Sequence, residues 1–280
     1  MQSPPRKKTF YPGGEYIFKY IRFLPIFDPQ KKIALLCSGK SGSTFAVKWF
    51  LFQVDMLEAA EFYSSWIHDF RTAVFYESNT YKTRIDEIFN PDILTIKYVR
   101  NRYHRAVSTY LNLCRARYNR IYGAGVPASA SMILGKLEQF LNRKFDAENS
   151  FSFIEFLHYL DHIDVENYDI HLMKQSANRA FENALKNLVI LKLEDSIEQL
   201  PVIEKEYGLK PSNISALKTS LHHTNQDKIN VGYCGDQMFK DKITGRLPEY
   251  RNFYNQQGIE LVKKIYGDDF TVYQYSADAI

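Results

Sequence analysis

The sequence predicts an α/β fold with a central, mostly parallel sheet. Apolar runs typical of buried strands occur at three places in the chain, and each is followed by a segment with helical periodicity. Strands that alternate with helices in this way favour a parallel sheet covered by the helices. The three pairs of segments are residues 31–37 and 43–60, 92–99 and 101–118, and 187–195 and 196–208.

The first pair opens with "KKIALLC" and the second with "DILTIKYV", both short and rich in β-branched or large apolar residues. In the third pair Ser196 is placed to cap a helix that closes at Gly208. Residues 119–187 have a mixed helical and irregular pattern, and a last helix is predicted from near Pro248 to Gly267. Residues 1–30 are predicted to be an N-terminal extension, and residues 31–280 a single domain.

The composition is that of a folded protein, and its charge is compatible with an anionic small ligand. The chain has 280 residues, of which 45% are hydrophobic and 24% charged, and its net charge of +4 comes from 36 basic and 32 acidic residues. This balance gives no reason to expect nucleic-acid binding. Three scattered cysteines without a CxxC pair suggest reduced thiols, and no apolar run has the length of a membrane span. We therefore expect a cytoplasmic protein, and its oligomeric state stays open.

The loop after the first predicted strand is a candidate phosphate site. "CSGKSGSTF", residues 37–45, contains the Gly-Lys-Ser of a triphosphate loop, but residues 34–38 lack the glycine that a Walker A loop requires four residues earlier. Gly39 and Gly42 allow a tight turn, after which the N–H groups of a helix start can point toward an anion. Lys40 adds a charge, so the loop is predicted to cradle a phosphate.

The loop after the second predicted strand favours a second anion. An ATP site of the Walker type needs an acidic residue for magnesium at a strand end, but this strand ends in Arg100. Arg105 and Ser108 follow at helical spacing, so an arginine and a hydroxyl could bind one phosphate together. Because ligands of open α/β sheets bind at the carboxyl ends of the strands, both loops are expected at one edge.

The two loops together resemble the family of sulfotransferases that use 3′-phosphoadenosine 5′-phosphosulfate (PAPS). "KSGSTF" is similar to the family's 5′-phosphosulfate loop and "VRNRYHRAVSTYLN" to its 3′-phosphate motif, in this order and about 56 residues apart (100 minus 44). "YDIHLMKQ", "VILKLED" and "YGDDFTVYQY" are similar to the carbohydrate-type branch, sulfotransferase family 2. The resemblance implies a three-layer fold like that of P-loop nucleotide kinases.

The resemblance also implies the reaction and its binding residues. PAPS would be the donor and PAP the product, and a sulfuryl group would pass in line, without a metal, to a hydroxyl of a carbohydrate or small metabolite. Lys40 would stabilise the leaving oxygen, while Arg100 and Ser108 would bind the 3′-phosphate. The residues implied to bind the donor are Lys40, Ser41, Gly42, Ser43, Thr44 and Phe45 on the 5′ side, Arg100 and Ser108 on the 3′ side, and Lys242, Gly245 and Arg246 in a closing loop.

His68 is the candidate general base, because a histidine titrates near neutral pH and because the resemblance implies a histidine or glutamate after the first helix. It lies 24 residues after Thr44 (68 minus 44), and we expect it at the end of a strand, where Asp69 would point the other way. A histidine merely packed beside Trp66 is the alternative, and Glu77 is the second candidate base.

Other polar residues are expected to have structural roles. His171 and Gln175 are expected to pack against helices. His104 is expected to face solvent, and Arg105 is expected to be either a surface charge or a ligand. The pair His222-His223 has no third ligand at metal spacing. Glu194 and Asp195 could imitate the acidic strand end of a Walker B motif, so a kinase that uses Mg-ATP is an alternative function. A catalytically inactive nucleotide-binding module of the same fold is a second alternative.

Overall fold

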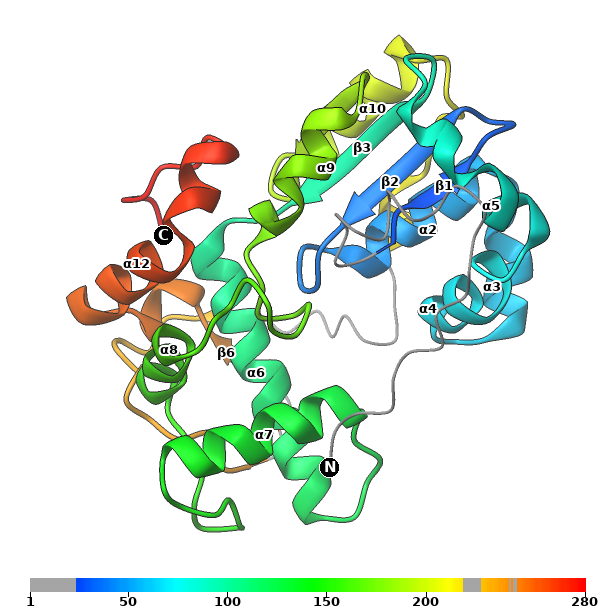
Figure 1. Cartoon of the computed structure of the whole chain (residues 1–280). Helices are drawn as coiled ribbons and strands as arrows, with labels where there is room; N and C mark the ends of the chain where they lie inside the picture. Colours follow the sequence, from blue (N-terminus) through cyan, green and yellow to red (C-terminus); the bar gives the residue numbers. More distant parts are fainter. Residues whose placement is uncertain (1–23, 219–227, 242, 244–245) are drawn as a thin grey trace. The chain divides into compact units, whose positions relative to one another are not determined.

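The computed structural model describes residues 24–218, 228–241, 243 and 246–280 (Figure 1). The described chain forms two compact units. The first comprises residues 24–37, 42–98 and 178–218, and the second residues 38–41, 99–177 and the described residues from 228 onward.

The first unit contains a four-stranded sheet in the order β1 (Ile26–Asp28), β2 (Ile33–Cys37), β3 (Leu94–Val99) and β4 (Leu188–Lys192). β2 and β3 are parallel, with Leu35 opposite Ile96, whereas β1 is antiparallel to β2. The predicted α/β class with a central, mostly parallel sheet is thus confirmed. β1 was not predicted, because its three residues are too few to give a periodic signal.

All six residues of β3 are buried. Since successive side chains of a strand point to opposite faces, both faces of the sheet are covered at β3. The first unit's helices supply this cover, with α2 in contact with β2 and α10 in contact with β4. They are α2 (Ser43–Gln53), α3 (Leu57–Tyr63), α4 (Ile67–Phe70), α5 (Asn79–Arg84), α9 (Arg179–Ala184), α10 (Ser196–Glu206) and α11 (Ile214–Lys218), with single turns η1 (Arg71–Phe75) and η2 (Ile85–Phe89).

Two polar contacts are buried in the core of the first unit. Lys97 of β3 forms an ion pair with Glu182 of α9, and both side chains are almost inaccessible to solvent. The indole Nε1 of Trp49 donates to Glu204 of α10 at 2.7 Å. A charge removed from water is tolerated only when it is paired, so the Lys97–Glu182 pair fixes how α9 lies on the sheet.

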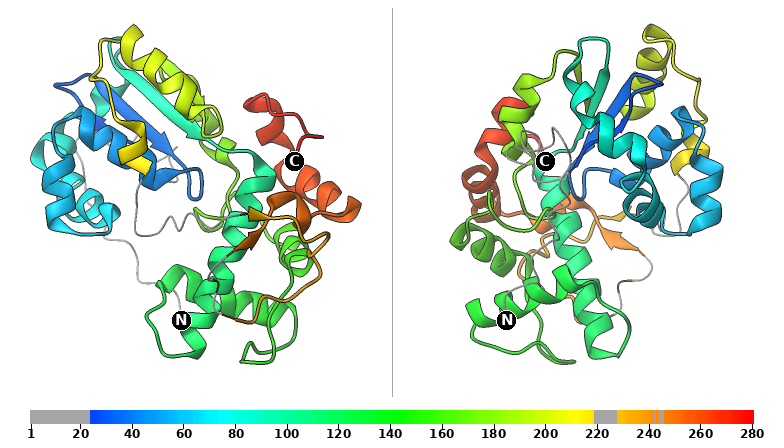
Figure 2. Two further views of the ribbon diagram at one scale, coloured as in Figure 1. Left: turned by 180° about the vertical axis from the view of Figure 1, so that it is seen from behind. Right: turned by 45° about the vertical axis from the view of Figure 1, so that its right-hand side comes forward.

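The second unit is built around the long helix α6 (Arg102–Ile121), which contacts α7 (Ala128–Phe140), α8 (Phe153–His162) and α12 (Gln256–Val272). Figure 2 shows these helices from two further sides. Aromatic side chains fill the core, where Tyr110 of α6 makes edge contacts with Phe151 and Phe153. The unit's remaining elements are η3 (Gln175–Asn178), β5 (Lys228–Ile229), β6 (Leu247–Pro248) and η4 (Tyr250–Phe253).

The last helix differs from its prediction at both ends. α12 begins at Gln256 with Asn255 as its N-cap, passes Gly267 and ends at Val272, with a non-helical residue at Tyr266. The prediction relied on Pro248 and Gly267 as boundary residues, but Pro248 lies in β6. In the third pair, α10 ends at Glu206 and Gly208 follows with a positive φ of 63°, as predicted. No helix in the described ranges is both long and apolar enough to cross a membrane.

Candidate functional site

The backbone of the first loop is held in an unusual conformation. Lys40 has φ of 64° and Gly42, the N-cap of α2, has φ of 83°, so two residues of this turn are left-handed. A Cβ on Gly39 would lie 3.0 Å from the carbonyl oxygen of Ile170, which is backbone and cannot move aside cheaply. The predicted tight turn is therefore present, and its two glycines have separate reasons: close approach at Gly39 and a left-handed backbone at Gly42.

The first turn of α2 leaves its N–H groups available to an anion. The first turn contains no acidic residue, and no side chain caps the helix. The first N–H groups of any helix lack intrahelical partners and carry partial positive charge. Ser43 and Thr44 are the first two residues of α2 and are half-buried. A helix start of this kind is suited to bind an anion, and the phosphate cradle stays a prediction.

Two other residues of the predicted cradle have structural roles. The Ser41 side chain is fully buried, and its hydroxyl donates to the carbonyl of Ser38 at 2.7 Å, which stabilises the turn. Phe45 is buried and makes an edge contact with Tyr98, with ring centroids 6.0 Å apart. Their side chains therefore serve the turn and the core.

Lys40 lies in a cationic environment. Burial lowers the pKa of Lys40 to about 8, and the charges of Arg115 and Arg100 act in the same direction. Each of these three influences disfavours the protonated amine. An anion bound beside Lys40 would reverse the effect, so this arrangement favours a negatively charged ligand.

Arg100 lies where the sequence predicts it, directly after β3, and it contacts the first loop. Its Nη1 donates to the carbonyl of Lys40 at 3.1 Å, and its Nη2 donates to the Tyr250 hydroxyl at 2.8 Å. Asn101 caps α6, its side chain accepting from the Tyr103 N–H at 2.9 Å. Ser108 follows two turns along α6 and is half-buried. The two predicted motifs are therefore brought together by the bond between Arg100 and Lys40.

Arg105 is neither a surface charge nor a free ligand. It is buried, and burial lowers its pKa to about 10. Its guanidinium donates to the carbonyl of Gly39 at 2.9 Å and to that of Met173 at 2.7 Å, with a further contact to His171 at 3.2 Å. Arg105 thus ties the first loop to the segment 170–173. The expectation of a surface charge was wrong because helical spacing gives position but not the carbonyls that a buried arginine can satisfy.

Gln175 connects the two loops from the other side. Its Oε1 accepts from the Ser38 hydroxyl and from the Arg100 N–H, both at 3.1 Å, and its Nε2 donates to the Arg100 carbonyl at 3.0 Å. Gln175 is the first residue of the short 3-10 helix η3, and its amide forms hydrogen bonds to both loops, so the expectation of mere helix packing was wrong. His171 lies in a turn, where its Nδ1 is 2.7 Å from a carboxylate oxygen of Asp169, so helix packing was also the wrong expectation for His171.

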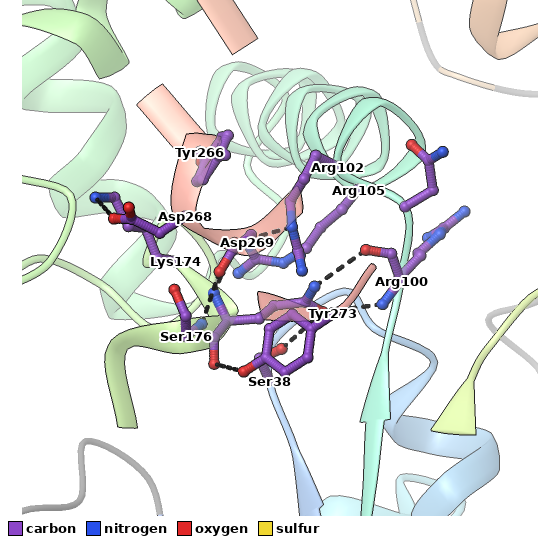
Figure 3. A network of polar contacts seen from close by, with 12 residues as sticks. Ser38, Arg100, Arg102, Arg105, Lys174, Ser176, Tyr266, Asp268, Asp269 and Tyr273 are labelled. Atoms are coloured by element: carbon purple, nitrogen blue, oxygen red, sulfur yellow. Dashed lines mark hydrogen bonds and ion pairs between the residues drawn. The ribbon is translucent and has the colours of Figure 1, made fainter. Parts of the chain in front are cut away.

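Asp269 of α12 holds this network in place (Figure 3). Its carboxylate forms an ion pair with Arg102 at 2.9 Å and accepts from the N–H groups of Gln175 at 3.0 Å and Ser176 at 2.7 Å. Both charged side chains of the pair are completely buried. The phenol of Tyr273 donates to the Gln175 carbonyl at 2.9 Å, so backbone and side chain of Gln175 are both fixed.

His68 lies in a helix and not at a strand end as predicted. It belongs to the short helix α4, and its Nε2 is 3.3 Å from the Thr44 hydroxyl. Its ring also makes an edge contact with the exposed Trp66, at 4.8 Å between centroids. The strand prediction failed because residues 57–75 form short helical segments. The histidine predicted from the sequence nevertheless contacts Thr44, at the end of the first loop.

Glu77, the second candidate base, is exposed and forms an ion pair with Lys82. In the predicted closing loop, Arg246 is exposed, whereas Lys242 and Gly245 lie outside the described residues. His222 and His223 lie outside them as well. His104 is half-buried and stacks on Tyr250, with ring centroids 4.6 Å apart, so the expectation that it faces solvent was wrong.

A family model described as "Sulfotransferase family" matches residues 26–276. The chain belongs to the sulfotransferase family. The match is to sulfotransferase family 2, as the sequence predicts, and it supports a sulfotransferase enzyme that transfers a sulfuryl group. No curated protein and no solved structure matches the chain significantly. The match spans both loops of the site in this sulfotransferase.

Replacing Arg105 with lysine tests whether the guanidinium fixes the backbone of the first loop. A lysine keeps the charge but cannot donate in several fixed directions, so buried carbonyls would lose their partners. We expect Arg105→Lys to lower the free energy of unfolding by about 2–4 kcal/mol, measured by urea denaturation.

The control is Arg115→Lys, at an exposed position of the same helix. It should change the unfolding free energy by less than about 0.5 kcal/mol. Equal effects of the two substitutions would show that Arg105 has no special role.

Proposed function

We propose that this sulfotransferase uses PAPS as its donor and transfers the sulfuryl group to a hydroxyl of a carbohydrate or small metabolite in the cytoplasm. The observation that carries the proposal is the hydrogen bond from Arg100 to the Lys40 carbonyl. It brings the cation of the 3′-phosphate motif to the loop of the 5′-phosphosulfate motif. A donor with two separate phosphate groups needs both.

The charges at the two motifs suit such a donor. Lys40 is destabilised in its charged form by burial, Arg115 and Arg100, and a polyanion would relieve this cost. The 5′ side would be bound by Lys40 and the first turn of α2, and the 3′-phosphate by Arg100 and Ser108. Arg246, with Lys242 and Gly245, would close over the nucleotide. The set of donor-binding residues proposed on the 5′ side is Lys40, Ser41, Gly42, Ser43, Thr44 and Phe45, with Ser41 and Phe45 contributing through the backbone.

The bound donor supplies an activated sulfuryl group whose leaving group is a phosphate. We propose in-line transfer without a metal, in which the Lys40 ammonium stabilises the negative charge that develops on the leaving oxygen. His68 would accept the proton of the acceptor hydroxyl. The 3.3 Å contact between its Nε2 and Thr44 supports this role, because it keeps the imidazole at the start of α2.

Calorimetric titration with PAP, and separately with ATP and magnesium, tests the donor class. We expect tight binding of PAP and none of Mg-ATP. Arg100→Ala should weaken PAP binding about ten- to a hundredfold, since it removes a charge-assisted hydrogen bond to phosphate. The exposed Arg179 of α9 serves as control, and Arg179→Ala should bind PAP as the wild type does.

A preference for Mg-ATP would replace this proposal with a kinase. Normal PAP binding by Arg100→Ala would remove Arg100 from the phosphate site.

The pH dependence of PAP affinity should report Lys40. In the free protein the pKa of Lys40 is about 8, and a bound anion raises it. Below pH 8 the amine is already protonated and binding takes up no proton at this site. Above pH 8 binding must protonate the amine, so affinity should fall as pH rises, by up to about tenfold per unit.

Calorimetry from pH 7 to 9.5 measures this slope, in a range where both phosphates are fully ionised. Lys40→Met should bind weakly and lack the wild-type decline above pH 8. An identical decline in that variant would assign the titration to another group.

His68→Ala should reduce the chemical rate without changing donor affinity. General base catalysis contributes about a hundred- to ten-thousandfold, so the rate of sulfuryl transfer from labelled PAPS to an active acceptor should fall by that order. PAP affinity should stay within about threefold of the wild type, because His68 is proposed to act on the acceptor. Glu77→Gln is the matched control and should retain the wild-type rate. A reduced transfer rate in Glu77→Gln together with a wild-type rate in His68→Ala would instead identify Glu77 as the general base.

A further inference from the structure

Tyr250 is surrounded by cationic groups. Arg100 Nη2 donates to its hydroxyl at 2.8 Å, and the guanidinium carbon lies 5.3 Å from the ring centroid. The Lys228 ammonium lies 4.1 Å from the same centroid. The imidazole of His104 stacks on the ring, with centroids 4.6 Å apart and planes at 29°. A neutral phenol is a weak partner for two cations, so this cluster can accept further negative charge.

The backbone fixes Tyr250 and Lys228 next to each other. Lys228 is opposite Leu247 in the parallel pair of β5 and β6, and the N–H of Glu249 donates to the Ile229 carbonyl at 3.0 Å. Tyr250 follows immediately as the first residue of η4. Because these bonds join backbone groups, Tyr250 and Lys228 would be neighbours even without a contact between their side chains.

The cluster lies on the face of α6 that carries the proposed phosphate ligands. Residues four apart on a helix share a face, so His104 and Ser108 lie on one side of α6. Arg100 precedes the helix, and its Nη2 reaches the same ring through its bond to the Tyr250 hydroxyl. Since Tyr250 stacks on His104 and hydrogen-bonds Arg100, its ring lies along this face. A phosphate bound by Arg100 and Ser108 would therefore lie over His104, beside the phenol.

We propose that Tyr250 and Lys228 are further ligands of the donor's 3′-phosphate, the hydroxyl of Tyr250 donating to a phosphate oxygen and Lys228 adding a charge. This inference rests on the proposed function and extends its 3′-phosphate site beyond Arg100 and Ser108. The hydroxyl accepts from Arg100, which leaves its own proton for the phosphate. The 3′-phosphate would thus be bound by groups from α6, β5 and η4.

The electrostatics of the phenol agree with this role. Burial alone raises the pKa of Tyr250, but the charges of Arg100 and Lys228 outweigh burial and lower it below its usual value. A more acidic hydroxyl is a stronger donor to phosphate. The nearest carboxylate along the chain, Glu249, forms an ion pair with Arg251 at 2.6 Å, so its charge is compensated.

The test compares PAP with adenosine 5′-phosphate, which lacks the 3′-phosphate, by calorimetry. We expect Tyr250→Phe, which keeps the ring stacked on His104, to weaken PAP binding about tenfold. Lys228→Met should weaken it about three- to tenfold, with a smaller salt dependence than in the wild type. Neither substitution should change the affinity for adenosine 5′-phosphate, which also shows that both variants are folded.

Arg251→Met is the matched control, since it removes one positive charge from the neighbouring residue, whose side chain is exposed and paired with Glu249. It should leave both affinities unchanged. Wild-type PAP affinity in Tyr250→Phe and Lys228→Met would overturn the inference and leave the proposed function standing. Tighter binding by Tyr250→Phe, or an equal loss for both nucleotides, would also overturn it. Failure of the wild type to bind PAP would instead refute the proposed function, and this inference with it.

Discussion

The second unit depends on the buried carboxylate of Asp269. A completely buried carboxylate is stable only when its oxygens are satisfied, and here Arg102 and the N–H groups of Gln175 and Ser176 satisfy them. These partners come from α6 and η3, so the carboxylate joins both segments to α12, although the three are distant in the sequence (Figure 3). Because Gln175 is fixed, its amide can bond Ser38 on one side and Arg100 on the other. Asp269 therefore fixes Ser38 and Arg100, one residue of each loop, through Gln175 and without a bond of its own to either residue.

The same unit contains two kinds of buried or half-buried cation. Arg102 and Arg105 are buried and engaged with protein groups, the first in an ion pair with Asp269 and the second in hydrogen bonds to the carbonyls of Gly39 and Met173. Burial lowers the pKa of Arg105 to about 10, and burial with the charges of Arg115 and Arg100 lowers the pKa of Lys40 to about 8. An arginine therefore stays protonated at neutral pH, whereas the Lys40 amine titrates close to it, so a ligand's negative charge would have the larger effect on the charge state of Lys40.

Much of the fold and the positions of the two candidate phosphate loops followed from the sequence. The strands β2, β3 and β4 are short apolar runs, and glycines with a lysine between them have few uses other than a tight cationic turn. Arg100 was identified because it replaces the acidic residue that a magnesium site would need. These features are local, so they can be predicted from neighbouring residues alone.

The residues that hold the site together could not be predicted in the same way. Arg105 and Gln175 are 70 residues apart (175 minus 105), and their roles arise from carbonyls and N–H groups that any sequence would supply. One signal was available: Arg102 and Arg105 lie on the buried face of α6, where a charge must have a buried partner. The segment around His68 was assigned to a strand because short helices of four to seven residues have no measurable period.

Local strain at Lys40 is maintained by contacts that surround it. A non-glycine residue in the left-handed region is unfavourable, and it persists only where the environment determines the backbone. Here Arg105 holds the carbonyl before Lys40 and Arg100 holds that of Lys40 itself. Since both bonds are made to backbone oxygens, they fix the turn without using the ammonium group. The chain thus orients Lys40 through its backbone alone, which is the preorganisation that the proposed stabilisation of a leaving group would require.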